Sequence, residues 1–271
     1  MYVDFPVPFV HAAVLCRDGQ ILCQQGDLSA EFPLMSVTKP LAAYAILLAV
    51  QGGKLALDAP AGPEAPGATL AHLLSHAAGL DYAGGQNCAP ETKRIYSNRG
   101  IELAAALAEQ STGLPFGELA QKTVFEPLGL AATQISGSPA WSGISTVADL
   151  VKVAAELSSP TLLAAELYRQ FRNPIFPELR GILPGYGMQN PCEFGLGVEV
   201  RGQKTPHWTT PLLPPETIGH FGISGSYVFA VPREADSPLA GVGGAFLGSE
   251  KFGAWHLENW PFLQKHLLAN L

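Results

Sequence analysis

The stretch MSVTKPLAAYAILLAV, residues 35–50, decides both the fold and the chemistry expected of this chain. It contains Ser36-Val37-Thr38-Lys39, a serine three residues ahead of a lysine. Residues at this spacing on a helix lie about 5–6 Å apart between Cβ atoms, so the Lys39 amine can reach the Ser36 hydroxyl. A neutral amine held there can remove the proton as the oxygen attacks a carbonyl. The pair alone is a weak signal, because a chain of this size holds about one such pair by chance.

Pro40 sets the local geometry around this pair. Proline cannot donate a hydrogen bond to the Ser36 carbonyl, and it disfavours helical geometry at the preceding residue. We therefore expect residues 36–39 to form a tight or 3₁₀-like turn, with the regular helix continuing from about Pro40. Residues 41–50 are apolar on every side, which is typical of a helix buried between layers, and Gly52-Gly53 supplies its end.

Composition limits the class of protein. The 271 residues can make one large domain or two intimate ones, and a hydrophobic fraction of 47% supports a sizeable core. Only 14% of residues are charged and the net charge is −7, so no basic surface is expected for nucleic acid or an anionic membrane. The longest apolar run is about half of the roughly 20 residues that a membrane span requires. Because the first residues show no basic stretch followed by an apolar one, we expect a cytoplasmic protein.

Cysteine spacing gives no zinc site and no Cys-x-x-Cys pair; the four cysteines are Cys16, Cys23, Cys88 and Cys192. Free thiols are therefore expected. Asp18-Gly19 predicts the turn of a hairpin, in which Cys16 faces Ile21 and Cys23 faces Val14. The first two cysteines are then diagonal neighbours rather than opposed ones, which disfavours a disulfide between them in a reducing compartment.

Periodicity separates the chain into β-type ends and a helical middle. Helices are expected over residues 70–77, 98–110, 116–125, 146–157, 162–171 and 255–268, and strands over residues 12–16, 21–24, 195–200, 217–222, 226–231 and 239–247. Pro261 is expected to be tolerated only near the first turn of the last helix. Together the elements predict an α/β fold, an antiparallel sheet flanked by helices with a mainly helical insertion. We expect a sheet domain from residues 1–31 and 194–271, a helical domain from residues 32–193, and the active site at their interface.

Tyr96-Ser97-Asn98 lies where a loop enters the helix expected over residues 98–110. A tyrosine there can exchange a proton with the serine oxygen or the leaving group if a nearby Lys⁺ lowers its pKa from about 10. Asn98 can accept a hydrogen bond from Lys39 and donate one to a substrate carbonyl. The simpler alternatives are that Tyr96 packs in the core and that Asn98 only caps the helix.

A third pattern, His220-Phe221-Gly222, lies on an expected strand that leads into Ile223. Glycine in a strand lets the backbone approach a ligand closely. The backbone N–H of Ile223 can then join that of Ser36 as a two-donor oxyanion hole, of the kind in which losing one donor costs about 10²–10³ in rate. The simpler alternative is that His220 only satisfies a backbone carbonyl.

In this order, Ser-x-x-Lys, Tyr-x-Asn and His-x-Gly resemble the penicillin-recognising serine hydrolases. The most similar branch contains class C β-lactamases, D-aminopeptidases and DD-peptidases, and β-lactamase-like carboxylesterases. The segments that carry the resemblance are MSVTKPLAAYAILLAVQGGKLALDAP, HLLSHAAGL, YSNRGIELAAALAEQSTG, STVADLVKVAAEL, FGLGVEV and GHFGISGSY. They cover nearly the entire chain, and the resemblance implies the β-lactamase/transpeptidase-like fold.

The resemblance also implies roles for the candidate residues. Ser36 would be acylated, Lys39 and Tyr96 would share the general-base and general-acid work, and the first proton acceptor stays open between them. Asn98 would orient the substrate, and the other wall of the site would be formed by His220, Phe221, Gly222 and Ile223. The family needs no metal or organic cofactor. In the segment HLLSHAAGL, His72 and His76 are expected to serve packing.

Two departures from the family pattern bear on the substrate. Residues 220–222 are His-Phe-Gly where true β-lactamases commonly have Lys-Thr-Gly, so a fixed cation for a substrate carboxylate is missing. Neutral histidine offers one donor and no permanent charge, which favours neutral acyl groups. The chain is also short between Asn98 and His220, which implies less roof over the cleft and a smaller or more open acyl pocket.

These features predict a serine hydrolase that acts through an acyl-enzyme on Ser36, with an esterase on small neutral esters or amides as first choice. The alternatives are a β-lactamase or D-amino-acid peptidase and, from another class, a non-catalytic binding protein of the same fold. The intact set of Ser36, Lys39, Tyr96 and Asn98 argues against the last. The expected partner is a small-molecule ester or amide, without nucleic acid or membrane, and the oligomeric state stays open.

Overall fold

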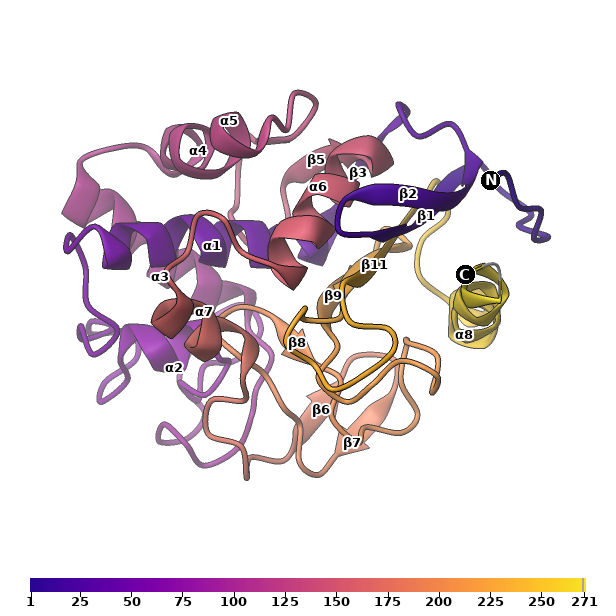
Figure 1. The fold of residues 1–271 in the computed structure, drawn as a ribbon. Helices are drawn as coiled ribbons and strands as arrows, with labels where there is room; N and C mark the ends of the chain where they lie inside the picture. The colour runs from indigo at the N-terminus through magenta and orange to yellow at the C-terminus, as the bar shows by residue number, and fades with distance from the viewer. Residues whose placement is uncertain (270) are drawn as a thin grey trace.

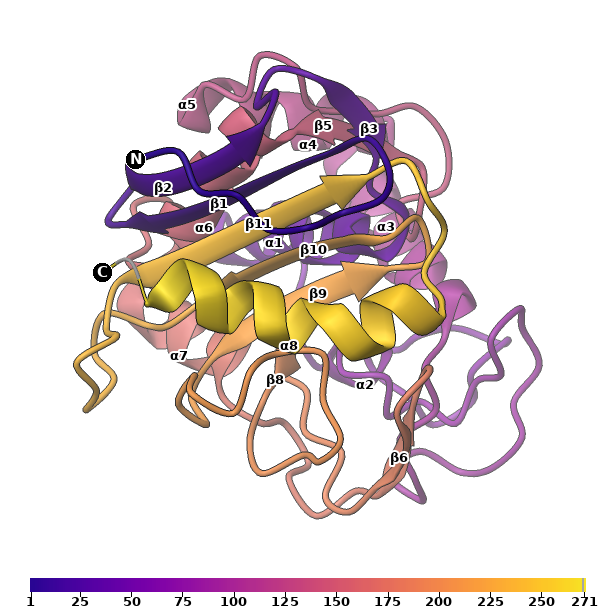
Figure 2. The same cartoon turned by 90° about the vertical axis from the view of Figure 1, so that its right-hand side faces the viewer.

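A six-stranded sheet forms the centre of the molecule, in a computed structural model that describes residues 1–269 and 271. The strand order is β2-β1-β11-β10-β9-β8 and every neighbouring pair is antiparallel. The strands are β1 (His11–Arg17), β2 (Gln20–Gly26), β8 (Glu199–Val200), β9 (Ile218–Gly222), β10 (Ser226–Ala230) and β11 (Val242–Gly248). Because β1 and β11 pair along their whole length, the two ends of the chain lie side by side in one sheet, as Figure 2 shows. The expected α/β fold is confirmed.

Helices cover both faces of this sheet. In Figure 2 the closing helix α8 (Ala254–Leu268) lies across the near face, while α6 (Val147–Ser158) and α1 (Thr38–Gln51) lie behind it. One apolar cluster fills the space between the sheet and the helical part, and a second, rich in aromatic rings, lies under α8 around Trp208, Tyr227 and Trp260. Burial of apolar area at about 25 cal/mol per Å² makes these two layers the main source of stability.

The remaining elements lie on the helical side or at its edges (Figure 1). The helical ones are α2 (Leu70–Leu74), α3 (Asn98–Thr112), α4 (Phe116–Ala120), the π-helical turn η2 (Gln121–Phe125), α5 (Glu126–Leu128) and α7 (Ala165–Arg172). A small sheet has the order β3-β5-β4, from Glu31–Pro33, Gly143–Thr146 and Gln134–Ile135. A separate hairpin pairs β6 (Gly181–Leu183) with β7 (Gly187–Gln189). The helices expected from the sequence cover all of these helical elements except α5, whereas none of these short strands was expected.

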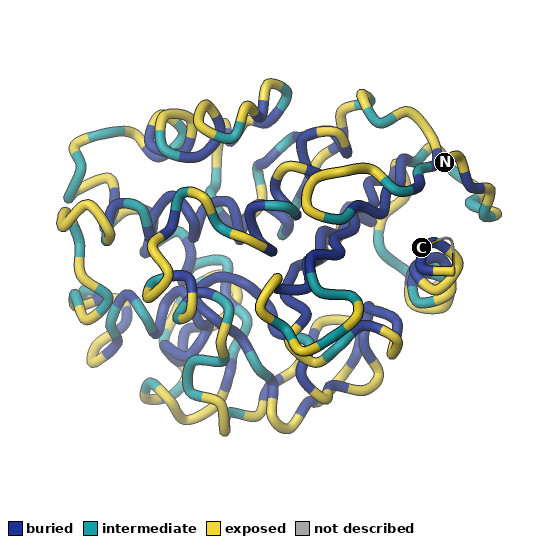
Figure 3. The backbone as a smooth tube through the Cα atoms, viewed as in Figure 1, coloured by how far each residue is buried: buried dark blue, intermediate teal, exposed yellow. Residues whose placement is uncertain are grey.

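Helix α1 runs through the middle of the molecule, where the tube in Figure 3 is almost continuously buried. The expected 3₁₀ turn is present as η1 (Met35–Val37), and α1 follows it directly from Thr38, two residues earlier than Pro40. Proline is tolerated there because the first turn of a helix has no intrahelical partner for its N–H groups. The apolar character of residues 41–50 on every side therefore reports burial between two layers.

Two local expectations are corrected. Cys23 pairs with Leu15 rather than Val14, because a bulge between Leu15 and Cys16 shifts the register; all four cysteines are free thiols. Pro261 lies well inside α8, which continues to Leu268. One lost hydrogen bond is tolerated because the helix is held to the sheet by its buried apolar face, with Trp260 fully enclosed.

No helix within residues 1–269 is both long and apolar enough to cross a membrane.

Candidate active site

Ser36 lies in the turn η1, between strand β3 and helix α1. The residue before it, Met35, has a φ of 47°, in the left-handed region that non-glycine residues seldom adopt. Strand β5 holds the turn from the side, because the N–H of Gly143 donates to Thr38 Oγ1 at 2.9 Å and the Gly143 carbonyl accepts from Leu34 at 2.8 Å. The strained turn is thus fixed by its neighbours, a pattern that clusters at functional sites.

Lys39 is completely buried and its Nζ meets three polar groups. The nitrogen lies 3.0 Å from Ser36 Oγ, 2.6 Å from Asn98 Oδ1 and 2.9 Å from the carbonyl oxygen of Ala140. It also stands 4.8 Å from the centroid of the Tyr96 ring. The structure therefore brings the four expected residues from the first two motifs into one contact group.

Burial lowers the pKa of Lys39 to about 7, and the opposing charge of Glu102 only partly offsets this effect. Near neutral pH a large fraction of the amine is therefore uncharged. A neutral amine has two N–H donors and one lone pair. The oxygens of Asn98 and Ala140 can occupy the two donors, because carbonyl oxygens only accept. The lone pair then remains for the hydroxyl proton of Ser36.

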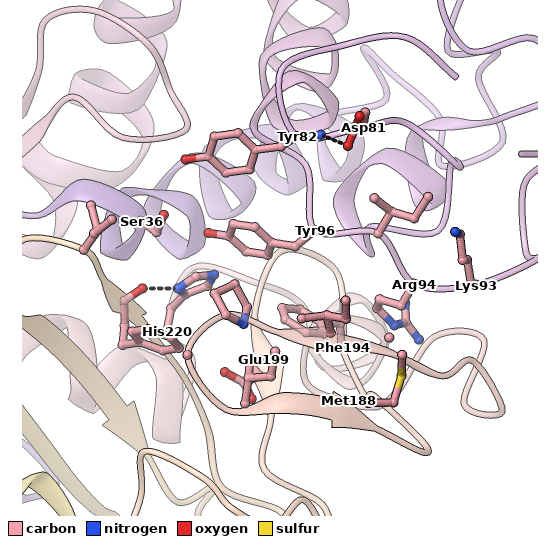
Figure 4. A pocket seen from close by; sticks show the side chains of 18 of the residues that line it. Ser36, Asp81, Tyr82, Lys93, Arg94, Tyr96, Met188, Phe194, Glu199 and His220 are labelled. Carbon is pink, nitrogen blue, oxygen red and sulfur yellow. Dashed lines mark hydrogen bonds between the residues drawn. The ribbon is translucent and has the colours of Figure 1, made fainter. Parts of the chain in front are cut away.

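Tyr96 lies two residues before the start of α3, and Figure 4 shows its hydroxyl turned toward Ser36. Its ring is flanked by His76, with centroids 4.7 Å apart, and by Tyr82 at 6.3 Å. Burial raises the pKa of Tyr96 well above its ordinary value, although a hydrogen bond with Ser36 acts in the opposite direction. The condition named from the sequence, a Tyr96 pKa lowered by a lysine cation, is therefore not met, and at neutral pH Tyr96 holds its proton.

At the start of α3, one residue caps the helix and the next contacts Lys39. Ser97 Oγ accepts from the N–H of Gly100 at 3.0 Å, so Ser97 is the N-cap. Asn98 is the first residue of the helix and turns its side-chain oxygen to Lys39. The alternative that Asn98 only caps the helix is therefore excluded.

His220 on strand β9 is buried, and its Nδ1 donates to the backbone carbonyl of Phe221 at 2.7 Å. Burial lowers the pKa of His220 to about 4, with the charge of Lys39 acting in the same direction, so the ring is neutral at physiological pH. Its one N–H is spent on the Phe221 carbonyl. The other nitrogen, Nε2, is buried without a partner among the described residues and can only accept.

Gly222 ends strand β9 directly against the turn that holds Ser36. A Cβ there would stand 2.3 Å from the carbonyl oxygen of Leu34 and 3.1 Å from the backbone nitrogen of Ser36. Glycine is therefore required for this close approach. The next residue, Ile223, has 58% of its surface exposed. The two backbone segments expected to supply the oxyanion donors are thus neighbours in space.

A cavity of about 920 Å³ opens over these residues (Figure 4). It is lined by Ser36, Tyr96, His220, Phe221 and Ile223 of the expected site residues, together with Tyr82, Trp141, the β6–β7 hairpin and Phe252. This volume lies near the upper end of the roughly 300–1,000 Å³ typical of small-molecule sites. The expectation of a smaller or more open acyl pocket than in the rest of the family stays a prediction.

A buried charge cluster borders the cavity, and the sequence analysis missed it. Glu199 on β8 lies 3.3 Å from Lys204 Nζ, and its carboxylate accepts from His207 Nε2 at 2.9 Å and Trp208 Nε1 at 2.8 Å. Burial by itself would raise the pKa of Glu199, but these partners outweigh it and hold the pKa at about 2. The partners come from a loop without motif or periodicity, so no sequence signal marked them.

We expect Glu199→Gln to destabilise the protein by about 3–5 kcal/mol, because it leaves the Lys204 charge buried without its counterion. Urea unfolding at pH 7 would measure the loss. The matched control is Glu64→Gln, which breaks a surface pair with Arg99 and should cost about 0–1 kcal/mol. Equal effects of the two variants would contradict a special role for the buried cluster.

His72 and His76 serve packing and hydrogen bonding, as expected. His72 contacts Thr69 and Glu91, while His76 accepts from the backbone N–H of Ser97 through Nδ1 at 3.3 Å. Within residues 1–269 and 271, no group of three or more His, Cys, Asp or Glu side chains is arranged to hold a metal ion.

The fold and these motifs define a β-lactamase-type serine hydrolase scaffold, and comparison with known proteins agrees. The family model described as Beta-lactamase matches residues 12–254. The chain belongs to this family. A β-lactamase crystal structure from Mycobacterium bovis is 39% identical, with a TM-score of 0.91 and coverage of 98% of this chain and 96% of that one.

Two curated proteins match shorter parts of the chain. Esterase EstB of Burkholderia gladioli is 27% identical over 44% of this chain and 45% of its own length. A β-lactamase of Pseudomonas fluorescens is 52% identical over 18% of this chain and 13% of its own length. The matched region thus spans less than half of either curated relative.

Proposed function

We propose that this protein is a serine hydrolase that forms an acyl-enzyme on Ser36, with neutral esters or amides of small molecules as substrates. The observation that carries the proposal is the 3.0 Å contact of Lys39 Nζ with Ser36 Oγ, made by an amine whose pKa burial lowers to about 7. A general base performs best when its pKa lies near the working pH. The family and its esterase relative support the same chemistry.

In the proposed acylation, Lys39 takes the Ser36 hydroxyl proton as Oγ attacks the carbonyl carbon. The backbone N–H groups of Ser36 and Ile223 hold the oxyanion. Tyr96 gives its phenolic proton to the departing alcohol or amine and regains a proton from the lysine ammonium. Water then attacks the acyl-enzyme by the reverse proton route, which releases the acid and restores Ser36.

The neutral-substrate part of the proposal rests on His220. A substrate carboxylate needs donors or a cation, whereas His220 is uncharged and spends its only N–H on the Phe221 carbonyl. The other ring nitrogen, Nε2, is buried without a partner among the described residues and offers no donor to a carboxylate. A neutral ester needs no such donor. We place the site between the sheet domain of residues 1–31 and 194–271 and the helical domain of residues 32–193.

A second candidate is a β-lactamase, with a D-amino-acid peptidase beside it. Two observations favour it: the 39% identical Mycobacterium bovis structure carries that name, and the cavity is also lined by Lys93 and Arg180, both of which are exposed cations. These cations could receive a carboxylate even though His220 does not.

The deciding experiment compares p-nitrophenyl acetate, p-nitrophenyl butyrate, nitrocefin and a D-alanine p-nitroanilide under one set of conditions, with fluorophosphonate labelling of the same protein. Ester turnover with labelling at Ser36 supports the first proposal. Much faster nitrocefin cleavage would transfer the assignment to β-lactamase. Absence of both labelling and turnover would indicate a binding protein of this fold.

The pH dependence follows from Lys39. The neutral amine is the proposed base and its pKa is about 7. We therefore expect kcat/KM to rise as the pH passes through about 7. Below this pKa, kcat/KM should fall about tenfold for each pH unit. Kinetics with p-nitrophenyl acetate from pH 4.5 to pH 9 would measure this rise of kcat/KM with pH, which we call the pH limb. Enzyme stability would be checked at each pH. A midpoint near 4 would point to His220 instead.

A further inference from the structure

The mouth of the cavity carries large apolar side chains that are exposed to solvent. Their exposed fractions are Tyr82 53%, Trp141 44%, Ile182 61%, Met188 62% and Ile223 58%. They come from four separate segments of the chain, yet all five line the same cavity. Single exposed apolar residues are ordinary, but an apolar rim continuous with a pocket marks a ligand-binding surface.

The β6–β7 hairpin presents two of these side chains as a pair. Ile182 and Met188 stand directly opposite each other in the register, whereas Leu183 and Gln189 on the other face are buried. Since side chains alternate across a strand, this face holds the apolar pair toward the opening of the cavity. Met188 is seen beside the cavity in Figure 4.

The base and the tip of the hairpin both contact residues that line the cavity. At its base, the N–H of Arg94 donates to the Arg180 carbonyl at 2.9 Å, only two residues from Tyr96. At its tip, a Cβ on Gly185 would stand 2.7 Å from the Phe252 ring, so the turn packs directly on that side chain. The hairpin is therefore a fixed wall of the cavity, and its apolar pair keeps its position relative to Ser36.

We propose that the substrate carries an apolar chain of medium length beside its ester bond, and that this chain lies across Ile182 and Met188. The inference rests on the proposed function and names its substrate class. An acetyl group leaves most of a cavity of about 920 Å³ unfilled, and it leaves the apolar rim in water. A chain such as octyl covers the rim, with each buried methylene improving binding about fourfold.

The test uses the double variant Ile182→Ser/Met188→Ser. For the wild type, kcat/KM should be at least about tenfold higher for p-nitrophenyl octanoate than for the acetate, measured below the concentration at which the octanoate aggregates. The double variant should lower this ratio about tenfold, with acetate, which has no chain to lie across the hairpin, as the internal reference. A second arm compares octyl acetate with ethyl acetate, which distinguishes a chain in the alcohol from a chain in the acyl group.

The matched control is Leu212→Ser/Phe262→Ser, which removes two equally exposed apolar side chains, 54% and 59%, away from the cavity. It should leave both ratios unchanged. A wild type that shows no chain preference in either arm, or a chain preference that the hairpin variant leaves intact, would overturn the proposal.

A binding measurement separates this inference from the proposed function. Titration calorimetry of Ser36→Ala with octanamide and acetamide reports the chain site without turnover. Tighter octanamide binding that disappears in the added hairpin variant supports the site even if no ester is cleaved. Equal, hairpin-independent binding in a protein that does cleave acetate overturns the site and leaves the hydrolase assignment standing.

Discussion

Replacing Ser36 with alanine is expected to lower kcat/KM for p-nitrophenyl acetate by about 10⁴–10⁶-fold and to abolish fluorophosphonate labelling. Of the three groups that contact Lys39 Nζ, the amide oxygen of Asn98, the carbonyl of Ala140 and the hydroxyl of Ser36, only the hydroxyl is a nucleophile. Its removal takes away the atom on which the proposed acyl bond would form. Residual turnover would come from binding and oxyanion donors alone.

Intact-mass spectrometry would follow the labelling, and unfolding in urea would show that the fold survives. The truncation removes one oxygen at a partly buried turn, so we expect a stability change within about 1 kcal/mol. Ser224→Ala is a suitable control, because this hydroxyl lies in the loop after β9 and contacts Ser226 Oγ at 2.9 Å. It should label as the wild type does. A labelled Ser36→Ala protein would contradict the assignment.

Helices and strands whose apolar pattern, start and end are all marked within one stretch of chain could be predicted from the sequence. Helix α3 was expected over residues 98–110 and is Asn98–Thr112, with Ser97 as its cap and Gly113 in the left-handed conformation after its end. Its apolar stripe, its start signal and its stop signal all lie within one stretch of chain. The central β-strands were recognised for the same reason, since their apolar runs are bounded by turn residues.

Elements whose stability comes from distant partners could not be predicted. The strands β3, β4 and β5 are two to four residues long, and such pairings have no periodicity to read. The acceptor on Ala140 lies 101 residues from Lys39. The run expected as a strand over residues 195–200 narrows to Glu199–Val200 because Gly197 turns with a φ of 89°.

The direction of the Tyr96 pKa shift could not be predicted for a similar reason, because it depends on burial by distant parts of the chain. Sequence placed a lysine near the tyrosine and so suggested a cation that would lower the tyrosine pKa. The fold buries both groups, which disfavours both charges at once: the lysine pKa falls and the tyrosine pKa rises. Burial thus leaves a largely neutral lysine and a protonated tyrosine, the states that the proposed base and acid roles require, and these states depend on burial rather than on residue type.

Replacing Lys39 with methionine, which has similar length and no charge, is expected to lower kcat/KM by about 10²–10⁴-fold because it removes the proposed general base. The variant should also lose the pH limb near 7, since the group that titrates there is gone. This second readout distinguishes a base from a residue that only holds the turn. Kinetics over the same pH range, with circular dichroism of the folded protein, would measure both.

The stability of Lys39→Met reflects two opposing effects. In the native state the lysine pKa is lowered from 10.5 to about 7, so between these values the unfolded chain binds more protons, and wild-type stability rises with pH across that window. Methionine removes this penalty of a few kcal/mol at neutral pH. It also leaves the oxygens of Asn98 and Ala140 without a donor, at about 1–3 kcal/mol each.

The two effects nearly cancel, so we expect the melting temperature of Lys39→Met at pH 7 to lie close to that of the wild type, and its dependence on pH between 7 and 10 to be flatter. Lys152→Met is the matched control for activity, because that lysine lies on α6 outside the cavity and its exposed ammonium pairs with the buried Asp149 carboxylate. It should keep both the activity and the pH limb. A Lys39→Met enzyme with an unchanged limb would move the role of base to another group.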